Sequence, residues 1–527
     1  MARRFGRSAW YLLAVAFAVV GCGGSGGGGG GGGNPPPGSG GPWLPYRGTA
    51  VFALDLSAPG ATPVTVDPSS NAGGLRLVES GTYSAATGTV SGLQPHTAIW
   101  ISGSRVSRGS AAAGGTPSAA QVSSESSVGD PSPLNPTANH LCDTAVTSDW
   151  ATPGDSRFFY TLAGSDRQCG GSDDVVKSAR LTSPSTEAPV TVPGRRISEI
   201  RSPSTGGITG WLLIDATNRL VRTDPAFANP VQLLASAGFA SVVGRAPSHL
   251  LLLVQSGPQV TVRRFDSAAG TLDTTALFTL PGGIGSTVGA TTQDDTTAYM
   301  MVFESGTSSR LLFRLALAAT QADSAVQMTS EAGHTTGPVL LATTNKVVFT
   351  TNAAGTDSLV AVDKTAAGSV AAPALGAASS SGTVLTLIGA AADRVYVNAR
   401  GTGRTARAVT ESGTDAIAEA NAAWLGLTDV AGTSTAVLAS GLSGATNFGG
   451  GSLSTVVAAT GAQGITLGTL PAELTTMDRL RWSGGKGLLR AFTDAQSVYG
   501  EVFFADATAA GSLLRVTNTP STSESLP

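Results

Sequence analysis

Charged and aromatic residues are scarce in this chain. Of its 527 residues, 13% are charged and 6% are aromatic, and there are only four histidines and three cysteines. The formal net charge is −3, with no basic patch to attract phosphate backbones, so we expect no nucleic-acid partner. The few aromatic side chains give little support to a carbohydrate-binding surface, which depends on stacking, although that function stays open as a third possibility.

The sequence also lacks the usual signatures of catalytic sites. The four histidines are far apart, and none has a second histidine four residues away, as a zinc site on a helix requires. The Gly-x-Ser-x-Gly pattern of serine hydrolases occurs only at residues 23–27, inside a glycine tract. No phosphate-cradling Gly-x-x-x-x-Gly-Lys-Ser/Thr motif is present. We therefore predict no catalytic residue, no metal ligand and no cofactor. The histidines in question are His96, His140, His249 and His334.

The first residues have the three-part layout of a secretory signal. Three arginines precede an apolar stretch at residues 9–20, which is followed by Gly21 and Cys22. A run of about twelve residues is too short to cross a bilayer, which takes about twenty. Residues 19–22, Val-Val-Gly-Cys, resemble the lipobox of bacterial lipoproteins. This resemblance implies cleavage before Cys22 and lipid on its sulfur. The alternative is an ordinary signal peptide that happens to end beside a cysteine.

Residues 23–41 are almost entirely glycine, with a few Ser, Asn and Pro. Such a segment cannot bury enough apolar area to offset the entropy of ordering it, so we expect a disordered leash. Two or more acyl chains give a lasting anchor. The lipoprotein resemblance, with Gly23 after the cysteine, implies the outer membrane. Loss of residues 1–21 would leave 29 of the 32 basic side chains against 35 acidic ones.

Two cysteines remain after lipidation, Cys142 and Cys169, in a compartment that oxidises thiols. Only one pairing is possible, and closing this 28-residue loop should stabilise the fold by about 3–4 kcal/mol. The alternative is a metal site or catalytic thiol, for which His140 is the one histidine nearby. We predict a structural disulfide.

Three carboxylates lie in a glycine-rich stretch around Cys169, namely Asp166, Asp173 and Asp174. Oxygen ligands on a flexible loop can bind calcium. The simpler interpretation, which we favour, is a solvated turn in which Asp and Gly supply the turn geometry.

From residue 50 onward one pattern recurs: a strand, an Asp, a turn of small residues and another strand. The intervals between successive copies are 42, 97 and 143 residues from Asp224 onward, which correspond to one, two and three steps of 42–49. A repeat of this length built from short strands predicts a β-propeller. Aspartate at a strand end is first of all a turn former, so we do not expect a ring of ligands. The copies end at Asp55, Asp224, Asp266, Asp363 and Asp506.

Continuous apolar runs precede most of these copies. Runs of this kind are typical of strands that are covered on both faces by neighbouring blades. Their spacing gives about eight four-stranded blades between residues 140 and 520, with seven or nine possible. We expect Phe52–Asp55 to complete the last blade and so close the ring; the alternative is that the copies at Asp55 and near residue 107 form a further partial blade. The runs are Phe158–Leu162, Trp211–Ile214, Leu250–Val254, Ala298–Phe303, Lys346–Thr350 and Arg394–Val397.

The predicted organisation is a signal peptide (1–21), a lipidated Cys22 with its leash (22–42), N-terminal strands with a Ser/Ala/Gly/Pro-rich loop (43–139), an all-β propeller (140–520) and a disordered tail (521–527). The strand, Asp and small-turn pattern resembles exported bacterial propellers of the quinoprotein-like and TolB-like kind.

The sequence determines the function of the protein less closely than its fold. We expect a propeller, lipid-anchored in the membrane, that binds or scaffolds an envelope protein. The alternative is a quinone-dependent or lactone-hydrolysing propeller enzyme. An enzyme should gather charged residues at the ring axis, whereas a scaffold should fill the axis with Ser, Thr and Ala.

Overall fold

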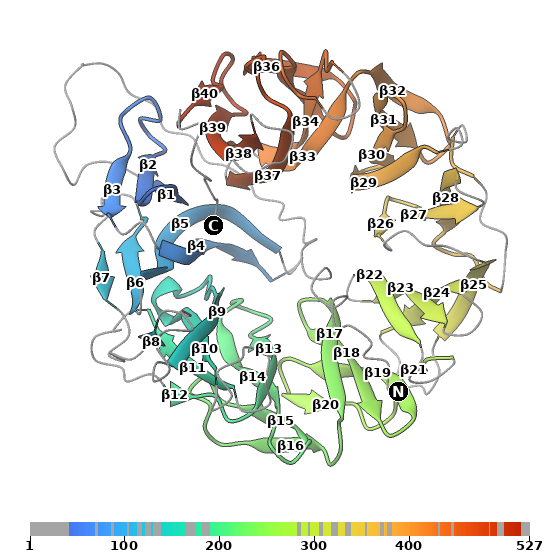
Figure 1. The fold of residues 1–527 in the computed structure, drawn as a ribbon. Helices are drawn as coiled ribbons and strands as arrows, with labels where there is room; N and C mark the ends of the chain where they lie inside the picture. The colour runs from blue at the N-terminus through green and yellow to red at the C-terminus, as the bar shows by residue number, and fades with distance from the viewer. Residues whose placement is uncertain are drawn as a thin grey trace, which may run out of the picture.

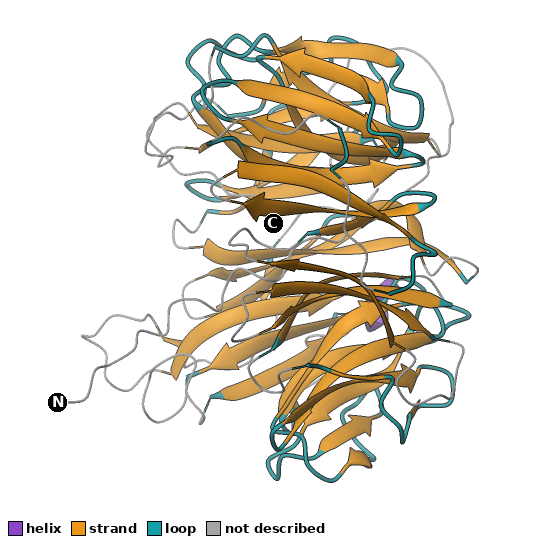
Figure 2. Cartoon of the chain, turned by 90° about the vertical axis from the view of Figure 1, so that its right-hand side faces the viewer, coloured by secondary structure: helices purple, strands orange, loops and turns teal. Residues whose placement is uncertain are grey.

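The computed structural model describes residues 42–517, with gaps at 69–71, 86–88, 103–104, 113–118, 122–127, 130–138, 164–173, 182–189, 282–285, 294–295, 305–308, 318–324, 333–338, 354–355, 369–373, 377–381, 431–432, 444–446, 484 and 493–499. Within these residues the only helix is the 3₁₀ turn η1 (Pro153–Asp155), and strands make up most of the rest (Figure 2). No helix in the described part of the chain is long and apolar enough to cross a membrane.

The described strands form ten sheets that follow one another around a ring, so the chain folds as a β-propeller (Figure 1). Each sheet is one blade, numbered here in chain order. Blade 1 contains β1 (Trp43–Arg47), β2 (Val51–Asp55) and β3 (Val64–Asp67). Blade 2 contains β4 (Ala72–Ser84), β5 (Thr89–Ser102), β6 (Arg105–Ser110) and β7 (Ala120–Gln121). Blade 3 contains β8 (Val128–Gly129), β9 (Asn139–Thr147), β10 (Arg157–Leu162), β11 (Val175–Arg180) and β12 (Val190–Thr191). Blade 4 contains β13 (Arg195–Arg201), β14 (Ile208–Ile214), β15 (Leu220–Thr223) and β16 (Val231–Leu234). Blade 5 contains β17 (Phe239–Arg245), β18 (His249–Ser256), β19 (Gln259–Asp266), β20 (Thr271–Leu272) and β21 (Phe278–Thr279).

The second half of the ring repeats this order. Blade 6 contains β22 (Thr287–Gln293), β23 (Thr297–Glu304), β24 (Ser309–Ala316) and β25 (Ala325–Ala332). Blade 7 contains β26 (Leu340–Ala342), β27 (Lys346–Ala353) and β28 (Thr356–Asp363). Blade 8 contains β29 (Val384–Ala391), β30 (Arg394–Arg400), β31 (Arg404–Thr410) and β32 (Asp415–Ala420). Blade 9 contains β33 (Ala423–Val430), β34 (Thr433–Ser440), β35 (Ser452–Val457) and β36 (Gln463–Thr469). Blade 10 contains β37 (Thr476–Ser483), β38 (Lys486–Phe492), β39 (Gly500–Asp506) and β40 (Leu514–Arg515).

Within a typical blade the inner strand lies nearest the middle of the ring, and the second, third and fourth strands follow outward (Figure 1). Because neighbouring strands are antiparallel, the turns alternate between the two faces of the ring. Face 1 carries the turns from inner to second strand and from third to fourth strand. Face 2 carries the turns from second to third strand.

The second strands are the most deeply buried. Residues 211–214 of β14 and residues 250–254 of β18 are all less than 9% exposed, because a neighbouring blade covers each face of the strand. Apolar clusters accordingly lie between blades: one of them joins Leu212 and Ile214 of blade 4 to Leu250 and Leu252 of blade 5. The six apolar runs predicted from the sequence are confirmed as strands, and all of them are second strands.

The recurrent aspartates at the ends of third strands are confirmed as turn formers. The Asp224 carboxylate accepts hydrogen bonds from the backbone N–H groups of Ala226 and Ala228, both at 2.9 Å. Asp266 and Asp506 bind the N–H groups of their own turns in the same way, at 2.8 and 2.9 Å. These carboxylates therefore shape face 1 at the outer edge of the ring.

The expected count of about eight blades is wrong, since the ring has ten. Eight sheets do lie between residues 128 and 515, where the repeat was counted, and the two further sheets lie in residues 43–121. The sequence of this region indicated at most one further partial blade, because it follows the repeat poorly. Blade 1 has three strands, and the third strand of blade 2 ends at Ser110 without the marker Asp.

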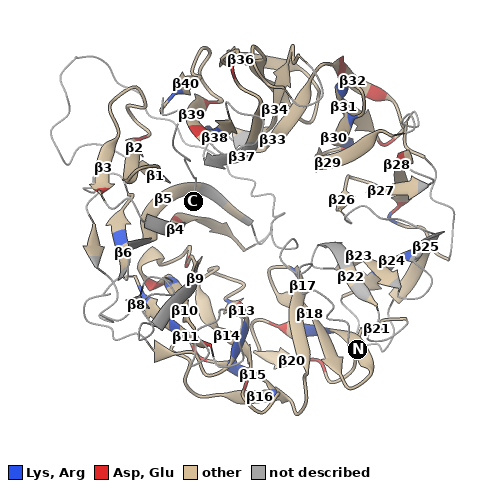
Figure 3. Ribbon diagram, in the orientation of Figure 1, with Lys and Arg blue, Asp and Glu red and all other residues tan. Residues whose placement is uncertain are grey.

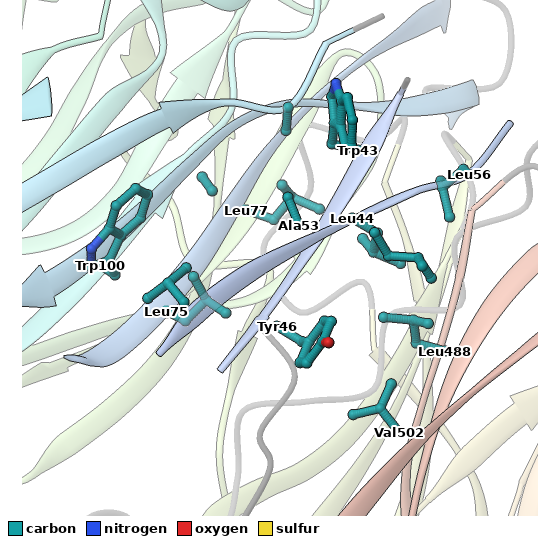
Figure 4. Packing of buried hydrophobic residues seen from close by; sticks show 14 of the residues in the cluster. Trp43, Leu44, Tyr46, Ala53, Leu56, Leu75, Leu77, Trp100, Leu488 and Val502 are labelled. Atoms are coloured by element: carbon teal, nitrogen blue, oxygen red, sulfur yellow. The ribbon is translucent and has the colours of Figure 1, made fainter. Parts of the chain in front are cut away.

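The expected mode of ring closure is also wrong. Phe52–Asp55 lies in β2, which pairs with β1 and β3, while blade 10 obtains its fourth strand from its own β40. The ring closes by side-chain packing instead: Leu44, Tyr46 and Leu56 of blade 1 lie beside Leu488 and Val502 of blade 10 (Figure 4). One polar contact adds to this packing, because Lys486 Nζ donates a hydrogen bond to the Leu56 carbonyl at 2.7 Å.

Blade 1 has no inner strand among the described residues. In other blades the N–H group after the third strand donates to the carbonyl just before the second strand, as from Ser267 to Ser248 at 2.9 Å. In blade 1 the same bond runs from Leu56 to Pro42, at 3.0 Å. Because this hydrogen bond identifies the residue just before a second strand, β1 is a second strand and Pro42 lies on face 1.

Blade 2 carries a long hairpin. Its strands β4 and β5 have 13 and 14 residues. In this blade the equivalent hydrogen bond runs from the Ala111 N–H group to the His96 carbonyl. His96 is therefore level with face 1, and residues 79–85 and 89–96 extend beyond it. We call this extension the hairpin arm. In Figure 1 the hairpin runs from blade 2 toward the middle of the ring.

Candidate functional site

Charge is unevenly distributed over the inner strands. The inner strands of blades 6, 7 and 8 contain no charged residue and consist of aliphatic, Thr, Gly, Ala and Gln side chains (Figure 3). The inner strand of blade 4 contains four charged residues within seven, and that of blade 5 ends in Arg245. The inner strands thus combine uncharged sectors, as expected of a scaffold, with charged ones, among which blades 4 and 5 bring described charges together.

Glu199 is the centre of this charged sector. Its Oε1 atom lies 3.3 Å from Arg201 Nε and 3.2 Å from an Arg245 guanidinium nitrogen, so it joins the inner strands of blades 4 and 5. Arg245 also donates a hydrogen bond to Ser198 Oγ. The side chains of Glu199 and Arg201 are 15% and 14% exposed, whereas Arg245 is 31% exposed. We call Glu199, Arg201 and Arg245 the Arg–Glu platform.

Arg201 is fixed on every side of its guanidinium. It donates hydrogen bonds to the carbonyls of Gly206 and Ser148, at 2.9 and 2.8 Å. Its Cζ atom lies 3.8 Å from the centre of the Trp150 ring, a cation–π contact. Arg245, with the larger exposed fraction, is therefore the member of the platform that a partner can reach.

Trp150 is positioned by a buried carboxylate. Asp149 is 4% exposed and accepts the N–H groups of Thr152, at 2.9 Å, and of Ile208, at 2.8 Å. These bonds tie the first turn of blade 3 to the second strand of blade 4. The aromatic ring beneath Arg201 is therefore held by the junction between two blades.

The hairpin arm contacts Trp150 and the first turn of blade 4. Tyr83 stacks on Trp150 with ring centroids 6.5 Å apart and an interplanar angle of 12°. Gly206, in the first turn of blade 4, approaches the Tyr83 ring so closely that an added Cβ would lie 2.6 Å from Tyr83 Cγ. The arm and the turns of blades 3 and 4 therefore form one packed unit on face 1.

The electrostatics of the platform keep Glu199 ionised. Burial alone would raise the pKa of its carboxyl, but the charges of Arg245, Arg201 and Arg196 and a backbone hydrogen bond outweigh burial and lower it to about 2. Burial lowers the pKa of Arg201, and the charge of Glu199 opposes that change. Glu199 is therefore a permanent counter-charge near neutral pH, and the platform is a preorganised ionic surface.

Replacing Gly206 by alanine should test how rigidly the arm is packed. Gly206 has φ +71°, and alanine there would meet both backbone strain and the Tyr83 ring. We expect the free energy of unfolding to fall by about 2–4 kcal/mol, from the left-handed backbone and from overpacking. The matched control is Gly257→Ala, which has φ +59° with no atom within 4 Å of the added Cβ, and which should cost about 1–2 kcal/mol. Equal losses, measured by denaturant unfolding, would show that Tyr83 moves aside freely.

Most of the residues singled out from the sequence fall outside this site. Cys22, Cys169, Asp166 and Asp173 lie outside the described residues, and so does the side chain of Cys142, whose backbone belongs to β9. The lipid attachment, the disulfide and the calcium loop therefore stay predictions. Asp174 lies just before β11 and is partly buried.

The described histidines make local contacts. His96 Nδ1 lies 2.8 Å from Thr97 Oγ1, and His249 Nδ1 lies 3.0 Å from Ser248 Oγ. Burial lowers the pKa of His96. In the part of the chain that the structure describes, no three His, Cys, Asp or Glu side chains are grouped as metal ligands would be.

A small hollow lies between blades 1 and 2. It is lined mainly by apolar residues, including Trp43, Val51 and Trp100, and has a volume of about 10 Å³. That volume suits about one water molecule.

One feature of the sequence indicated the platform, but our interpretation of the sequence did not use it. Residues 195–201 read Arg-Arg-Ile-Ser-Glu-Ile-Arg, which places four charges within seven residues of a chain that is only 13% charged. Glu199 and Arg201 are two apart and so lie on the same side of a strand. Arg245 is 44 residues beyond Arg201, so only the packing of blade 5 against blade 4 brings the two together.

Known proteins resemble this chain only distantly. No protein-family model and no curated protein matches the chain, so its likeness to quinoprotein-like and TolB-like propellers stays a prediction. Solved structures match at low identity. A eukaryotic initiation factor matches with TM-score 0.45 and 7% identity, over 91% of this chain and 97% of that one.

Prolyl peptidases also match. A structure from a study of two prolyl endopeptidases has TM-score 0.34 and 10% identity, over 68% of this chain and 54% of that one. Apo prolyl oligopeptidase B from Galerina marginata has TM-score 0.36 and 8% identity, over 86% of this chain and 51% of that one. The chain thus spans about half the length of these peptidases, and nothing about its activity follows from the match.

Proposed function

We propose that this protein is a bacterial lipoprotein, anchored through Cys22 to the outer membrane, whose ten-bladed propeller binds an envelope protein on face 1. The observation that carries the binding role is the Arg–Glu platform. The partly exposed guanidinium of Arg245 lies against Glu199, which is already ionised. Glu199 in turn pairs with Arg201, which is hydrogen-bonded and stacked on Trp150. A surface ordered before binding loses little entropy when a partner arrives.

The chemistry of the platform indicates what the partner presents. Arg245 contacts Glu199 through Nη1 and donates to Ser198 through Nη2, and the N–H groups left over by these contacts suit a carboxylate, which arginine binds well. The partner should therefore place an Asp or Glu side chain against Arg245. The anchor itself rests on the sequence of residues 1–41. No described residue specifically favours the alternative, a quinone-dependent or lactone-hydrolysing enzyme.

Covalent crosslinking in living cells tests this function. A carboxylate–amine crosslinker should trap the wild-type protein in a defined adduct with a second envelope protein, seen as one heavier band and identified by mass spectrometry. Arg245→Ala should lose at least nine-tenths of that adduct, because a charged hydrogen bond at an interface is worth about 1.5–3 kcal/mol.

Arg219→Ala is the matched control. Arg219 belongs to the same blade as Glu199 but lies at the turn between its second and third strands, on face 2, where it pairs with Asp215 at 2.7 Å. This variant should keep the adduct. Equal adducts in both variants would exclude the platform as the binding surface, and Cys22→Ala should lose the adduct if the partner resides at the same membrane.

A further inference from the structure

We propose that the ring opens reversibly between blades 4 and 5, by separation of the two blades on face 1, and that Arg245 is the latch that holds this junction closed. The two blades meet along β13 and β17, the strands that carry the platform (Figure 1). Glu199 and Arg201 belong to blade 4 and Arg245 to blade 5, so opening takes the platform apart. That consequence for binding rests on the proposed function, whereas the opening itself needs no partner.

Among the described residues, six of the ten junctions between blades share one type of hydrogen bond on face 1. The acceptor is the backbone carbonyl of the residue just after a third strand, and the donor belongs to the preceding blade of the ring. Each bond therefore ties one blade to the main chain of the next. The donors are the side chains of Arg108, Arg264, Arg314, Tyr396 and Lys486 and the N–H group of Trp43, and their acceptors, in the same order, are Leu181, Leu317, Lys364, Ala458, Leu56 and Ala111.

Three further junctions are tied to the main chain by other bonds. They are the junctions between blades 3 and 4, between blades 7 and 8, and between blades 9 and 10. The donors are the Arg201 side chain and the N–H groups of Thr344 and Leu513, and their acceptors are the carbonyls of Ser148, Ala392 and Leu467, at 2.8, 2.9 and 2.8 Å.

The junction between blades 4 and 5 has neither kind of bond on face 1 within the described residues. Arg222, like three of the donors above, lies near the end of a third strand. Its guanidinium instead covers Gly270, where an added Cβ would lie 3.0 Å from Arg222 Cζ, and its buried Nε has no hydrogen-bond partner in the described part of the chain. The junction is closed here by Arg245, through the ion pair with Glu199 at 3.2 Å and the hydrogen bond to Ser198 Oγ. Both contacts end on side chains, and water competes for a guanidinium that is 31% exposed.

The same two blades are joined more firmly on face 2. The Ala237 N–H group donates to the Asn218 carbonyl at 2.7 Å, and Arg195 Cζ lies 5.4 Å from the centre of the Phe239 ring. The chain also passes from β16 to β17 on this face. The junction thus has a hinge on face 2 and one polar latch on face 1, which is the arrangement that favours local opening.

Native-state thiol labelling of the full chain tests this opening. Leu252 and Leu251 are neighbours on β18 and both are 0% exposed, but Leu252 packs between blades 4 and 5 and Leu251 between blades 5 and 6. Each is replaced by cysteine, and the protein is mixed with excess thiol reagent without denaturant. A buried thiol reacts only when its surroundings open, so its rate reports the population of the open form. Peptide mass spectrometry separates the introduced site from Cys22, Cys142 and Cys169.

We expect Leu252→Cys to react at least tenfold faster than Leu251→Cys. Arg245→Ala should speed Leu252→Cys at least threefold more and leave Leu251→Cys unchanged. Arg264→Ala, which removes the bond between blades 5 and 6, should speed Leu251→Cys instead. Equal rates for the two cysteines, an equal effect of Arg245→Ala on both, or no effect of Arg264→Ala on Leu251→Cys would overturn the latch.

A second pair of variants serves if either cysteine prevents folding. Leu212 and Leu213 of β14 are both 0% exposed, and they pack toward blades 5 and 3 respectively. Leu212→Cys should again react at least tenfold faster than Leu213→Cys, and equal rates would overturn the latch. The assay contains no partner, so it is independent of the binding function. Faster labelling between blades 4 and 5, together with equal crosslinked adducts in Arg245→Ala and Arg219→Ala, would overturn that function and support the latch.

Discussion

Deleting residues 43–67 should convert the protein into an aggregating chain that no longer unfolds cooperatively. These residues are blade 1, and their removal exposes apolar side chains on both neighbouring blades. Each buried side chain of this size contributes about 1.5–3 kcal/mol, so the total approaches the 5–15 kcal/mol stability of a typical protein. The exposed residues are Leu75, Leu77 and Trp100 of blade 2 and Leu488, Val502 and Phe504 of blade 10, all less than 9% exposed in the intact ring.

The measurement is size-exclusion chromatography with light scattering, followed by denaturant unfolding. The matched control deletes residues 23–41, which should leave the oligomeric state and the unfolding midpoint unchanged. A monomeric 43–67 deletion with the wild-type midpoint would mean that the remaining nine blades close by themselves. The packing of blade 1 against blade 10 would then contribute nothing to ring closure.

Replacing Glu199 by glutamine should lower the free energy of unfolding by about 3 kcal/mol at pH 7. Because the pKa of Glu199 is lowered from 4.5 to about 2 in the folded protein, its ionised form favours folding. That contribution is fully present above pH 4.5, the pKa of the unfolded chain, and is lost as the pH falls toward about 2. The variant keeps the size of the side chain but leaves Arg201 and Arg245 without their counter-charge.

The pH dependence makes this prediction specific. The stability difference between wild type and Glu199→Gln should be largest at neutral pH and shrink steadily between pH 4.5 and about 2. Glu419→Gln, on the outer strand β32, is the control and should change stability by less than about 0.5 kcal/mol. A difference that stays constant with pH would show that Glu199 acts through packing rather than charge.

From the sequence, an enzyme was expected to gather charged residues at the ring axis and a scaffold to fill it with small uncharged ones. The ring shows both features. The inner strands β22, β26 and β29 contain no charged side chain, as a scaffold requires. The sector formed by β13 and β17 gathers arginines around one carboxylate. Its members are paired with one another, and Glu199 has its pKa far below neutrality. The charged sector is therefore compatible with both hypotheses, a binding surface and a catalytic centre.

The sequence by itself determined the repeating unit. The apolar runs such as Leu250–Val254 became second strands because only a strand covered on both faces tolerates continuous hydrophobic residues. The aspartates such as Asp266 became turn formers because a short carboxylate binds the N–H groups two and three residues ahead. Both are local or nearly local effects, and composition and spacing are enough to predict them.

The tertiary structure alone decided how many units close the ring, how they close it and where the charged site lies. Tyr46 meets Val502, and Glu199 meets Arg245, through contacts between blades that are remote in sequence. Such contacts depend on the angle between successive blades and on the side chains at each junction. A repeat length does not encode either of these. The position of Pro42 on face 1 is of the same kind, since one hydrogen bond from Leu56 fixes it.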